Sequence, residues 1–361
     1  MPFSSLLRPY ARRGASSQTR SRVMPLRAPR RPRGLARLLV GAALSGWLLS
    51  GCQGEPSNLG VEAVEVDAPA AAPAELAPGV VIDLGTEEGP AHLTEGFSAP
   101  ERIGSRRASW SEGETSSVAF SVRGGAPEYL LAFLAEPYHV LGDVSMGVSL
   151  NRRPVVDTIV SRGWRAYGLV VSGNLLAQGR NELAFHYTKT GRPSDFDPRS
   201  NDIRELSVRF DQIQVQPITS EAELSFGSRN AIALAALGDG WARDPNDRGT
   251  GTWTVANRAV VTFHIAKSAA PLYRVSLAAR TPRGTAEQPV AISLNGETLG
   301  QLAFHEKKST LSLDVPAQRL KGENEIALEF AQLKSPAELD PSSKDMRLLG
   351  LRVFELDVKP K

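Results

Sequence analysis

The chain has 361 residues, which is long enough for two domains with hydrophobic cores of their own. Its pI of about 9.0 comes from one end of the sequence. All ten basic residues before Cys52 are arginines, and no acidic residue lies there. From Cys52 onward 32 basic residues face 39 acidic ones, a net charge of −7. This balance argues against nucleic acid as a partner, because nucleic-acid binding rewards a basic surface.

The first 51 residues are typical of a bacterial export signal. An arginine-rich stretch precedes an uncharged apolar run, residues 38–51, which is too short to span a bilayer comfortably. The run ends in Leu49-Ser50-Gly51-Cys52, and Cys52 is the only cysteine of the chain. This motif resembles the bacterial lipobox. The resemblance implies cleavage before Cys52, acylation of that residue and membrane lipid as a partner, and Gln53 implies sorting to the outer membrane. An ordinary secretory signal with a chance cysteine is the alternative, and Met24 is a second candidate start.

The segment after Cys52 is predicted to be a tether. Residues 53–78 are rich in Ala and Pro and contain five acidic and no basic residues. Such a composition buries too little apolar surface to fold and favours an extended, self-repelling chain. We therefore expect residues 52–79 to space the folded part away from the membrane.

An internal repeat organises the remainder. Gly179-Arg180-Asn181-Glu182-Leu183 returns as Gly322-Glu323-Asn324-Glu325-Ile326, a shift of 143 residues. Trp110 and Trp253 keep the same shift. A repeat of this length is too long for a solenoid and fits two whole domains in tandem. We predict one domain over residues 80–217 and its duplicate over residues 218–361.

Both halves carry short runs of alternating apolar residues, broken by Gly, Pro, Asn and Asp every 8–15 residues. This pattern predicts strands and turns, without an amphipathic helix of three turns or more. About eight strands in each half predict an all-β chain of two tandem antiparallel β-sandwiches of jelly-roll, galactose-binding-like type. An immunoglobulin-like Greek key is the alternative.

Catalytic and metal-binding patterns are sparse. The five histidines show no metal-ligand spacing, and no phosphate-binding glycine loop or nucleophile elbow occurs. Ser98-Ala99-Pro100-Glu101-Arg102 matches the short core motif of sulfatases, but the acid-rich metal site and α/β body of those enzymes are not indicated. The acids Asp239, Asp244 and Asp247 suggest a weak structural Ca²⁺ site, against the usual role of Asp in turns. No other cofactor is expected, and the chain is predicted not to be an enzyme.

Aromatic residues beside loops are the candidate ligand contacts. Sugars pack their C–H faces on aromatic rings while polar groups bind their hydroxyls. The repeated Trp110 and Trp253 are expected to fill the cores. Phe97 and Trp241 are expected near a rim, and Trp164 has no counterpart in the second half, so the fold does not require it. The binding candidates are Phe97, Trp164, Arg165, Tyr167, Trp241 and Arg243.

Several motifs of the second half resemble those of jelly-roll, carbohydrate-binding-like modules appended to bacterial surface-polysaccharide enzymes, including sulfatase-like and glycosyltransferase-like proteins. The motifs include Leu237-Gly238-Asp239-Gly240-Trp241, Ser293-Leu294-Asn295-Gly296 and Ser335-Pro336-Ala337-Glu338-Leu339. The resemblance implies an envelope lipoprotein whose modules bind a glycan or envelope polymer. A structural lipoprotein that binds an envelope protein is the first alternative, and a sulfatase-like enzyme is the second.

Overall fold

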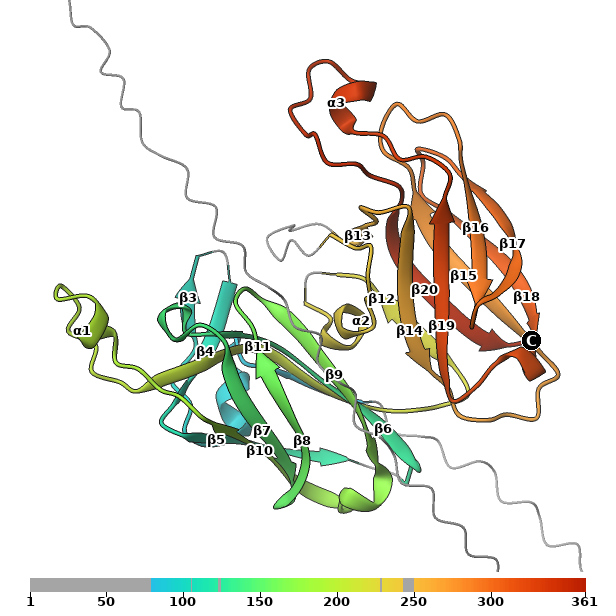
Figure 1. Cartoon of the computed structure of the whole chain (residues 1–361). Helices are drawn as coiled ribbons and strands as arrows, with labels where there is room; N and C mark the ends of the chain where they lie inside the picture. Colours follow the sequence, from blue (N-terminus) through green and yellow to red (C-terminus); the bar gives the residue numbers. More distant parts are fainter. Residues whose placement is uncertain (1–78, 105, 123–124, 228, 243–249) are drawn as a thin grey trace, which may run out of the picture. The chain divides into compact units, whose positions relative to one another are not determined.

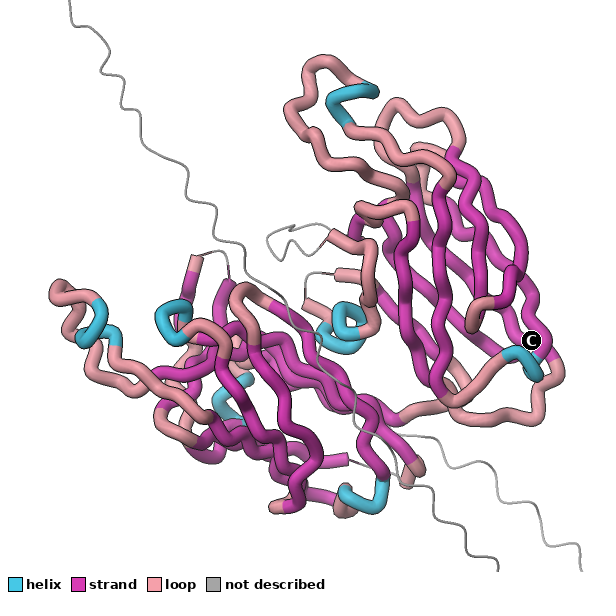
Figure 2. Tube along the Cα trace, viewed as in Figure 1, coloured by secondary structure: helices cyan, strands magenta, loops and turns pink. Residues whose placement is uncertain are grey.

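The computed structural model describes residues 79–104, 106–122, 125–227, 229–242 and 250–361. All of them belong to the unit Pro69–Lys361. The predicted signal, Cys52 and the tether lie outside the described residues, as do Arg243, Asp244 and Asp247. Strands dominate the described chain, and its helices are short (Figure 2).

Residues 80–217, here module 1, form two antiparallel sheets around one core (Figure 1). The first sheet contains β3 (Glu101–Ile103), β4 (Arg106–Glu112), β11 (Leu206–Pro217), β6 (Glu128–Pro137) and β9 (Arg165–Ser172) in spatial order, with β1 (Val80–Asp83) also paired to β11. The second contains β2 (Leu93–Glu95), β5 (Thr115–Val122), β10 (Gly179–Tyr187), β7 (Val144–Leu150) and β8 (Arg153–Val160). Because β4, β5, β6 and β7 alternate between the sheets, the chain follows a jelly-roll path.

Residues 218–361, here module 2, repeat this arrangement. One sheet contains β12 (Ala222–Ser225), β20 (Arg352–Pro360), β15 (Leu272–Arg280) and β18 (Ser309–Pro316), with β13 (Thr252–Trp253) also paired to β20. The other contains β14 (Arg258–His264), β19 (Glu323–Phe330), β16 (Gln288–Leu294) and β17 (Glu297–Phe304). The predicted fold class, tandem jelly-roll sandwiches, is confirmed.

Short helices occupy the connections. The α-helices are α1 (Pro193–Phe196), α2 (Ala231–Ala235) and α3 (Pro336–Leu339), and the 3₁₀ turns are η1 (Gly89–His92), η2 (His139–Leu141), η3 (Gly173–Leu175) and η4 (Ala317–Arg319). None of the helices in these ranges has the length and apolar character needed to cross a bilayer.

The alternating pattern of the strands builds each core. In β10, Leu183, Phe185 and Tyr187 are buried while the residues between them are not. Phe185 meets Phe210 of the opposite sheet with ring centroids 4.7 Å apart. A fully buried Phe stabilises a fold by about 1.5–3 kcal/mol. The period of two therefore fixes which face of each strand turns inward.

The duplicated Gly-x-Asn motif has the same structural role in both modules. The side chain of Asn181 is 1% exposed, and its Oδ1 accepts hydrogen bonds from the amide of Asn151 (2.8 Å) and from the Ala177 backbone N–H (2.7 Å). In module 2 the Oδ1 of Asn324 accepts in the same way from Asn295, at 3.1 Å. Asn151 and Asn295 adopt left-handed backbone angles, φ 51° and 53°. Asparagine tolerates that conformation better than most residues. The repeat therefore encodes a hydrogen-bonded pair of turns.

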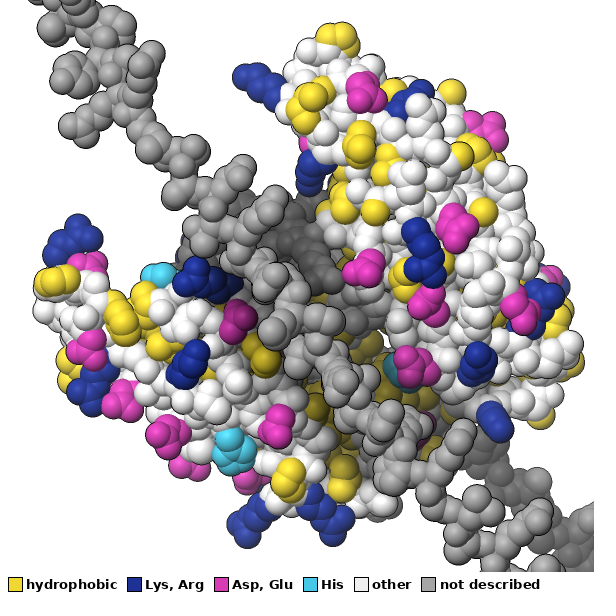
Figure 3. Space-filling view, viewed as in Figure 1, with side chains coloured by type: hydrophobic (Ala, Val, Ile, Leu, Met, Phe, Trp, Pro, Cys, Tyr) yellow, Lys and Arg dark blue, Asp and Glu magenta, His cyan; other side chains and the backbone are white. Residues whose placement is uncertain are grey.

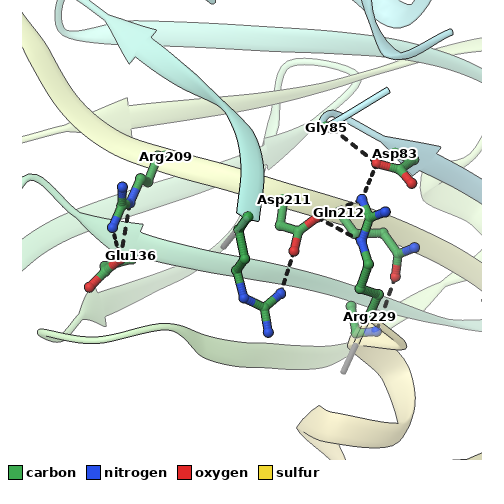
Figure 4. A network of polar contacts seen from close by, with 9 residues as sticks. Asp83, Gly85, Glu136, Arg209, Asp211, Gln212 and Arg229 are labelled. Carbon is green, nitrogen blue, oxygen red and sulfur yellow. Dashed lines mark hydrogen bonds and ion pairs between the residues drawn. The ribbon is translucent and has the colours of Figure 1, made fainter. Parts of the chain in front are cut away.

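Helix α2 of module 2 packs on the first sheet of module 1, against β6, β9 and β11. Gln212 and Gln214 of β11 accept hydrogen bonds from the backbone N–H groups of Ala231 (3.3 Å) and Ile232 (2.8 Å) at the start of the helix. The Arg229 guanidinium, just before the helix, binds both Asp211 and Asp83 (Figure 4). The two glutamine contacts satisfy helix donors that have no intrahelical partner.

The equivalent sheet faces of the two modules differ in polarity. In module 1 the outward residues of β6 under the helix are Leu130, Ala132 and Leu134, which contribute to an apolar cluster with α2. By strand register their equivalents on β15 are Arg274, Ser276 and Ala278. The apolar face in module 1 therefore matches its covering helix, whereas the face in module 2 carries polar groups suited to water.

Asp357 lies on this outer face of module 2, at the position that Gln214 has in module 1 by strand register. Its substitution tests how much a polar group on this face affects stability. Its Oδ1 is buried and accepts no hydrogen bond from any described residue, and burial raises the pKa of its carboxyl above the usual range. We expect Asp357→Asn to stabilise the protein at neutral pH by about 1 kcal/mol, or a melting temperature about 2–4 °C higher.

The pH dependence has a defined sign. A carboxyl whose pKa is raised by folding opposes folding above that pKa, and this penalty disappears as the pH falls from the raised pKa to the ordinary pKa of the unfolded chain. The stability difference between Asp357→Asn and the native protein should therefore shrink as pH falls through the raised pKa. Thermal melts across an acid titration measure it. A variant equal to or less stable than the native protein at neutral pH would contradict this account.

Candidate functional site

A groove crosses the outer face of the second sheet of module 1, over strands β8, β7 and β10. Its cavity volume is about 410 Å³, and its polar lining consists of Ser149, Arg152, Asp157, Glu182 and His186. Asp157, Glu182 and His186 are exposed, whereas Ser149 is 8% exposed on the floor. The volume falls within the range of small-molecule sites.

Strand register places the central groups of the groove. On β7, Gly147 lies opposite Asp157 of β8 on one side and opposite His186 of β10 on the other. Because opposite residues share a sheet face, the carboxylate and the imidazole flank a position that has no side chain. A Cβ atom at Gly147 would lie 3.1 Å from the Asp157 Oδ1. The backbone of Gly147 does not require glycine, so the residue keeps space open.

Hydrogen bonding in the groove is sparse. The Ser149 hydroxyl lies 3.4 Å from His186 Nε2, at the long end of the hydrogen-bond range. No ion pair joins His186 to a carboxylate in the part of the chain that the structure describes. Within the described residues, the Ser149–His186 pair therefore has no carboxylate that would orient the imidazole, as catalysis by such a pair requires.

The groove can hydrogen-bond a polyhydroxylated ligand from several sides. Asp157 and Glu182 accept hydrogen bonds, Arg152 donates them, and Ser149 and His186 do both. Basic and acidic side chains are interspersed over the face of the molecule shown in Figure 3, without a large field of one sign.

The aromatic candidates Phe97 and Trp241 face the cores instead of a rim. Trp241 is 4% exposed, its indole N–H donates to the Val260 carbonyl oxygen at 2.6 Å, and its ring stacks on Phe226. Phe97 is half-buried and packs edge-on against Phe210, with centroids 5.6 Å apart. The expectation of a rim position is wrong for both. Each residue also forms an isolated backbone bridge, Phe97 with Ser111 and Trp241 with Thr254.

Tyr167 is also engaged within the fold. Its ring stacks on Phe133 with centroids 5.3 Å apart, and its hydroxyl accepts the Ser161 backbone N–H at 2.9 Å. Burial raises the pKa of the Tyr167 hydroxyl. The residue is half-buried, and both its ring and its polar atom have partners inside module 1. It therefore builds the sheet and contributes no open platform.

Trp164 is half-buried and belongs to a stack of aromatic and guanidinium groups. The Arg209 guanidinium carbon lies 5.0 Å from the Trp164 ring and 5.2 Å from the Trp110 ring, and that of Arg106 lies 5.3 Å from Trp164. Trp164 also packs against the cluster around helix α2. The neighbouring Arg165 is exposed. The exposure expected for Trp164 is therefore only partial.

Both repeated tryptophans were expected in the cores, and the structure confirms this for Trp110 but not for Trp253. Trp110 is 7% exposed and meets Tyr138 edge-on. Trp253 is half-buried and lies beside the guanidinium groups of Arg280 and Arg352 instead of inside the core of module 2.

The other chemical motifs have structural partners or lie apart from one another. Ser98 is 7% exposed, and its hydroxyl donates to the Ala99 carbonyl oxygen and accepts from the Trp110 backbone N–H. Of the calcium candidates, Asp239 is exposed, whereas Asp244 and Asp247 lie outside the description. Among the described residues no group of three or more His, Cys, Asp or Glu is arranged to hold a metal ion.

The polar residues of the groove were not predicted as site residues. Gly147, Asp157 and His186 come from three strands, and only the cross-strand register brings them together. The sequence of β7 did hold a weak indication of the groove, because its apolar residues alternate with small ones, and the small residues Gly147 and Ser149 face outward. Small residues at the outward positions of a central strand could therefore have been used to predict a groove on that face.

No protein-family model matches the chain, and no curated protein sequence matches it. Among solved structures, the chain is similar to the tandem CBM22-1–CBM22-2 domain of Xyn10C from Paenibacillus barcinonensis, with 12% identity, coverage of 79% of this chain and 98% of that one, and a TM-score of 0.27. It is similar to a family 35 carbohydrate binding module from Clostridium thermocellum, with 14% identity, coverage of 38% and 98%, and a TM-score of 0.25. It is also similar to the ANXUR2 extracellular domain from Arabidopsis thaliana, with 9% identity, coverage of 78% and 96%, and a TM-score of 0.28. At these values the likenesses assign neither a family nor a ligand.

Proposed function

We propose that the protein is a non-catalytic, glycan-binding lipoprotein of the bacterial outer membrane. The lipobox-like motif at Cys52 and Gln53 supports acylation and sorting, and the acidic Ala/Pro-rich stretch after it supports a spacer role. The tandem sandwiches then serve as recognition modules held near the envelope.

The observation that carries the binding function is the gap at Gly147 between Asp157 and His186. A sugar ring presents hydroxyl groups around its edge, and this groove offers acceptors and donors on both sides of an unoccupied strand position. The groove lies on a preformed sheet, so binding requires little reordering of the backbone.

The groove has a chemistry that favours binding over turnover. Hydrolysis of a glycoside needs two carboxyl groups on either side of the scissile bond, with pKa values driven apart by their surroundings. Asp157 and Glu182 are both exposed, where their oxygens can accept hydrogen bonds from ligand hydroxyl groups. We therefore assign them to hydroxyl recognition.

A blocking variant tests this proposal. Gly147→Val leaves every polar group in place and fills the gap, and the exposed Asp157 carboxylate can move aside. After a glycan array identifies the best-bound neutral oligosaccharide, calorimetric titration of the full chain should show at least a tenfold weaker affinity for Gly147→Val. Asp157→Ala should weaken binding at least tenfold, since one lost hydrogen bond to a charged partner costs about 1.5–3 kcal/mol, and His186→Ala should weaken it several-fold, since an ordinary hydrogen bond contributes about 0.5–1.5 kcal/mol.

Asp195→Ala is the matched control, because Asp195 is an exposed acid on helix α1 of the same module. Its affinity should equal that of the native protein. Thermal melts should show each variant folded. Oligosaccharide binding that survives Gly147→Val unchanged would refute the groove as the site.

A further inference from the structure

The loop that leads into the last strand is built in the same way in both modules. It covers residues 188–205 in module 1, with helix α1, and residues 331–348 in module 2, with helix α3 (Figure 1). An isolated β-bridge closes the base of each loop, Gly191 to Leu206 in module 1 and Lys334 to Leu349 in module 2. The duplication therefore includes these two loops as well as the strands.

Each loop contains an arginine that folds back on the aspartate two residues before it. The Arg204 guanidinium donates to the two carboxylate oxygens of Asp202 at 2.9 Å and 2.6 Å, and the Arg204 backbone N–H donates to the same carboxylate at 3.0 Å. Arg347 binds Asp345 through the same three donors, at 3.0 Å, 2.7 Å and 3.0 Å. A bidentate pair of this kind fixes the geometry of both side chains. We call this arrangement the Asp-x-Arg clamp.

The residue inside each clamp is apolar and faces the solvent. Ile203 is 74% exposed and Met346 is 73% exposed, the highest values among the exposed large apolar side chains of the described chain. Neither belongs to a hydrophobic cluster of the described residues. Phe196 and Leu348 in the same two loops are also exposed. The fold therefore does not need an apolar side chain inside the clamp, yet both copies have one.

The chemistry of the two loops fits an apolar partner. The aliphatic side chains of Ile203 and Met346 have no flat ring on which a pyranose could pack. Residues 188–205 contain four basic and four acidic residues, and residues 331–348 contain three of each, so neither loop has a net charge that would select an ion. An apolar tip on a neutral loop is suited to the boundary between headgroups and acyl chains of a phospholipid bilayer.

We propose that Ile203 and Met346 dock the two modules on the bilayer that holds Cys52. A specific protein interface buries about 800 Å² on each partner, whereas each loop offers only two exposed large apolar side chains. A bilayer accepts such a tip at any point, because it has no fixed pockets to match. Residues 53–78 span at most about 90 Å when fully extended, so the modules stay within reach of an anchored Cys52.

Docking by these tips is weak without the anchor, since each tip buries few methylene groups and stable attachment to a membrane takes two signals. The clamp keeps the cost of docking low, because the loop is ordered before it meets the lipid. The choice of a bilayer rests on the proposed function, which places an acyl anchor at Cys52. The test below omits that anchor, so the two proposals can fail separately.

The test uses residues 53–361, which lack the predicted signal and Cys52 and retain both hydrophobic cores. This part of the chain contains no cysteine. An environment-sensitive fluorophore can therefore be attached at Ile203→Cys, at Met346→Cys or, as the control, at Ile159→Cys. Ile159 of β8 is 57% exposed and lies outside both loops. With phosphatidylcholine vesicles, we expect the emission to shift to the blue at positions 203 and 346 and to stay unchanged at position 159.

Co-sedimentation with the same vesicles measures the affinity. The double variant Ile203→Asp, Met346→Asp should bind at least tenfold more weakly than the native sequence, whereas Ile159→Asp should change the affinity less than twofold. Because the loops carry no net charge, added salt should not weaken binding, and mixed vesicles with phosphatidylglycerol should not bind more tightly. All three positions are exposed, and thermal melts should show every variant folded.

Three results would overturn the proposal. The first is a chain that binds neither kind of vesicle, above all if the labels in the loops respond instead to delipidated envelope proteins, which would assign the loops to a protein partner. The second is an equal response of the labels at positions 159, 203 and 346, which would show general adhesion. The third is binding that requires phosphatidylglycerol and is lost in salt, which would show attraction by surface charge.

Discussion

Asp211→Ala is expected to lower the free energy of unfolding by about 3–5 kcal/mol, the cost of removing one partner from a buried ion pair. The Asp211 side chain is 1% exposed and accepts from two arginines, Arg106 of β4 and Arg229 before helix α2. Arg106 is itself only 8% exposed, so its guanidinium group stays buried after this carboxylate is removed. Urea denaturation of the full chain measures the effect.

The control for Asp211→Ala is Glu205→Ala. Glu205 binds Arg192 at 2.7 Å, but both side chains are about half exposed, 45% and 51%. A surface pair of this kind contributes about 0–1 kcal/mol. Equal losses for the two variants would show that burial of Asp211 does not set its contribution, contrary to this account.

Trp241→Ala is the second variant with a large expected effect, again about 3–5 kcal/mol, because it opens a cavity in the core of module 2. The side chain is 4% exposed, packs against Phe226, and donates a hydrogen bond to Val260. Differential scanning calorimetry should show a lower melting temperature for the variant. Oligosaccharide affinity of the protein that remains folded should equal that of the native protein.

Trp241→Phe separates packing from hydrogen bonding, since it keeps a ring and removes the indole N–H. It should cost less than Trp241→Ala and leave the Val260 carbonyl oxygen without that donor. Native-like stability of Trp241→Ala together with a loss of oligosaccharide binding would instead identify Trp241 as a ligand contact.

The sequence was sufficient to predict the fold, because the fold depends on local periodicity. Leu183, Phe185 and Tyr187 alternate with polar residues and turn inward. Asn181 and Asn324 recur at the same point of the repeat and make the same hydrogen bonds. Each of these features can be recognised in a short stretch of the sequence, and each predicts the position of a strand or a turn.

The candidate site could not be predicted in the same way, because it depends on contacts between residues that are far apart in the sequence. Asp157, Gly147 and His186 become neighbours only through strand register. Trp241 beside a Gly/Asp-rich loop suggested a rim position, yet its ring is buried and packs on Phe226 in the core of module 2. Register is set by tertiary pairing, so single residues beside loops were unreliable guides to exposure.

We attribute the asymmetry of the two modules to duplication followed by divergence. The outward face of β6 is apolar where helix α2 covers it, and the equivalent face of β15 is polar. The Glu136 position likewise changed to Arg280. The first sheet of module 1 thus supplies the surface that helix α2 of module 2 covers.

The central claim is that a neutral oligosaccharide occupies the groove at Gly147, and a ¹H–¹³C NMR titration of the histidine rings tests it most directly. The chain has five histidines, and only His186 lines the groove. The account predicts that saturating oligosaccharide shifts the His186 ring signals and leaves those of His92, His139, His264 and His305 in place. Binding that leaves His186 unshifted, or that shifts another histidine instead, would contradict it.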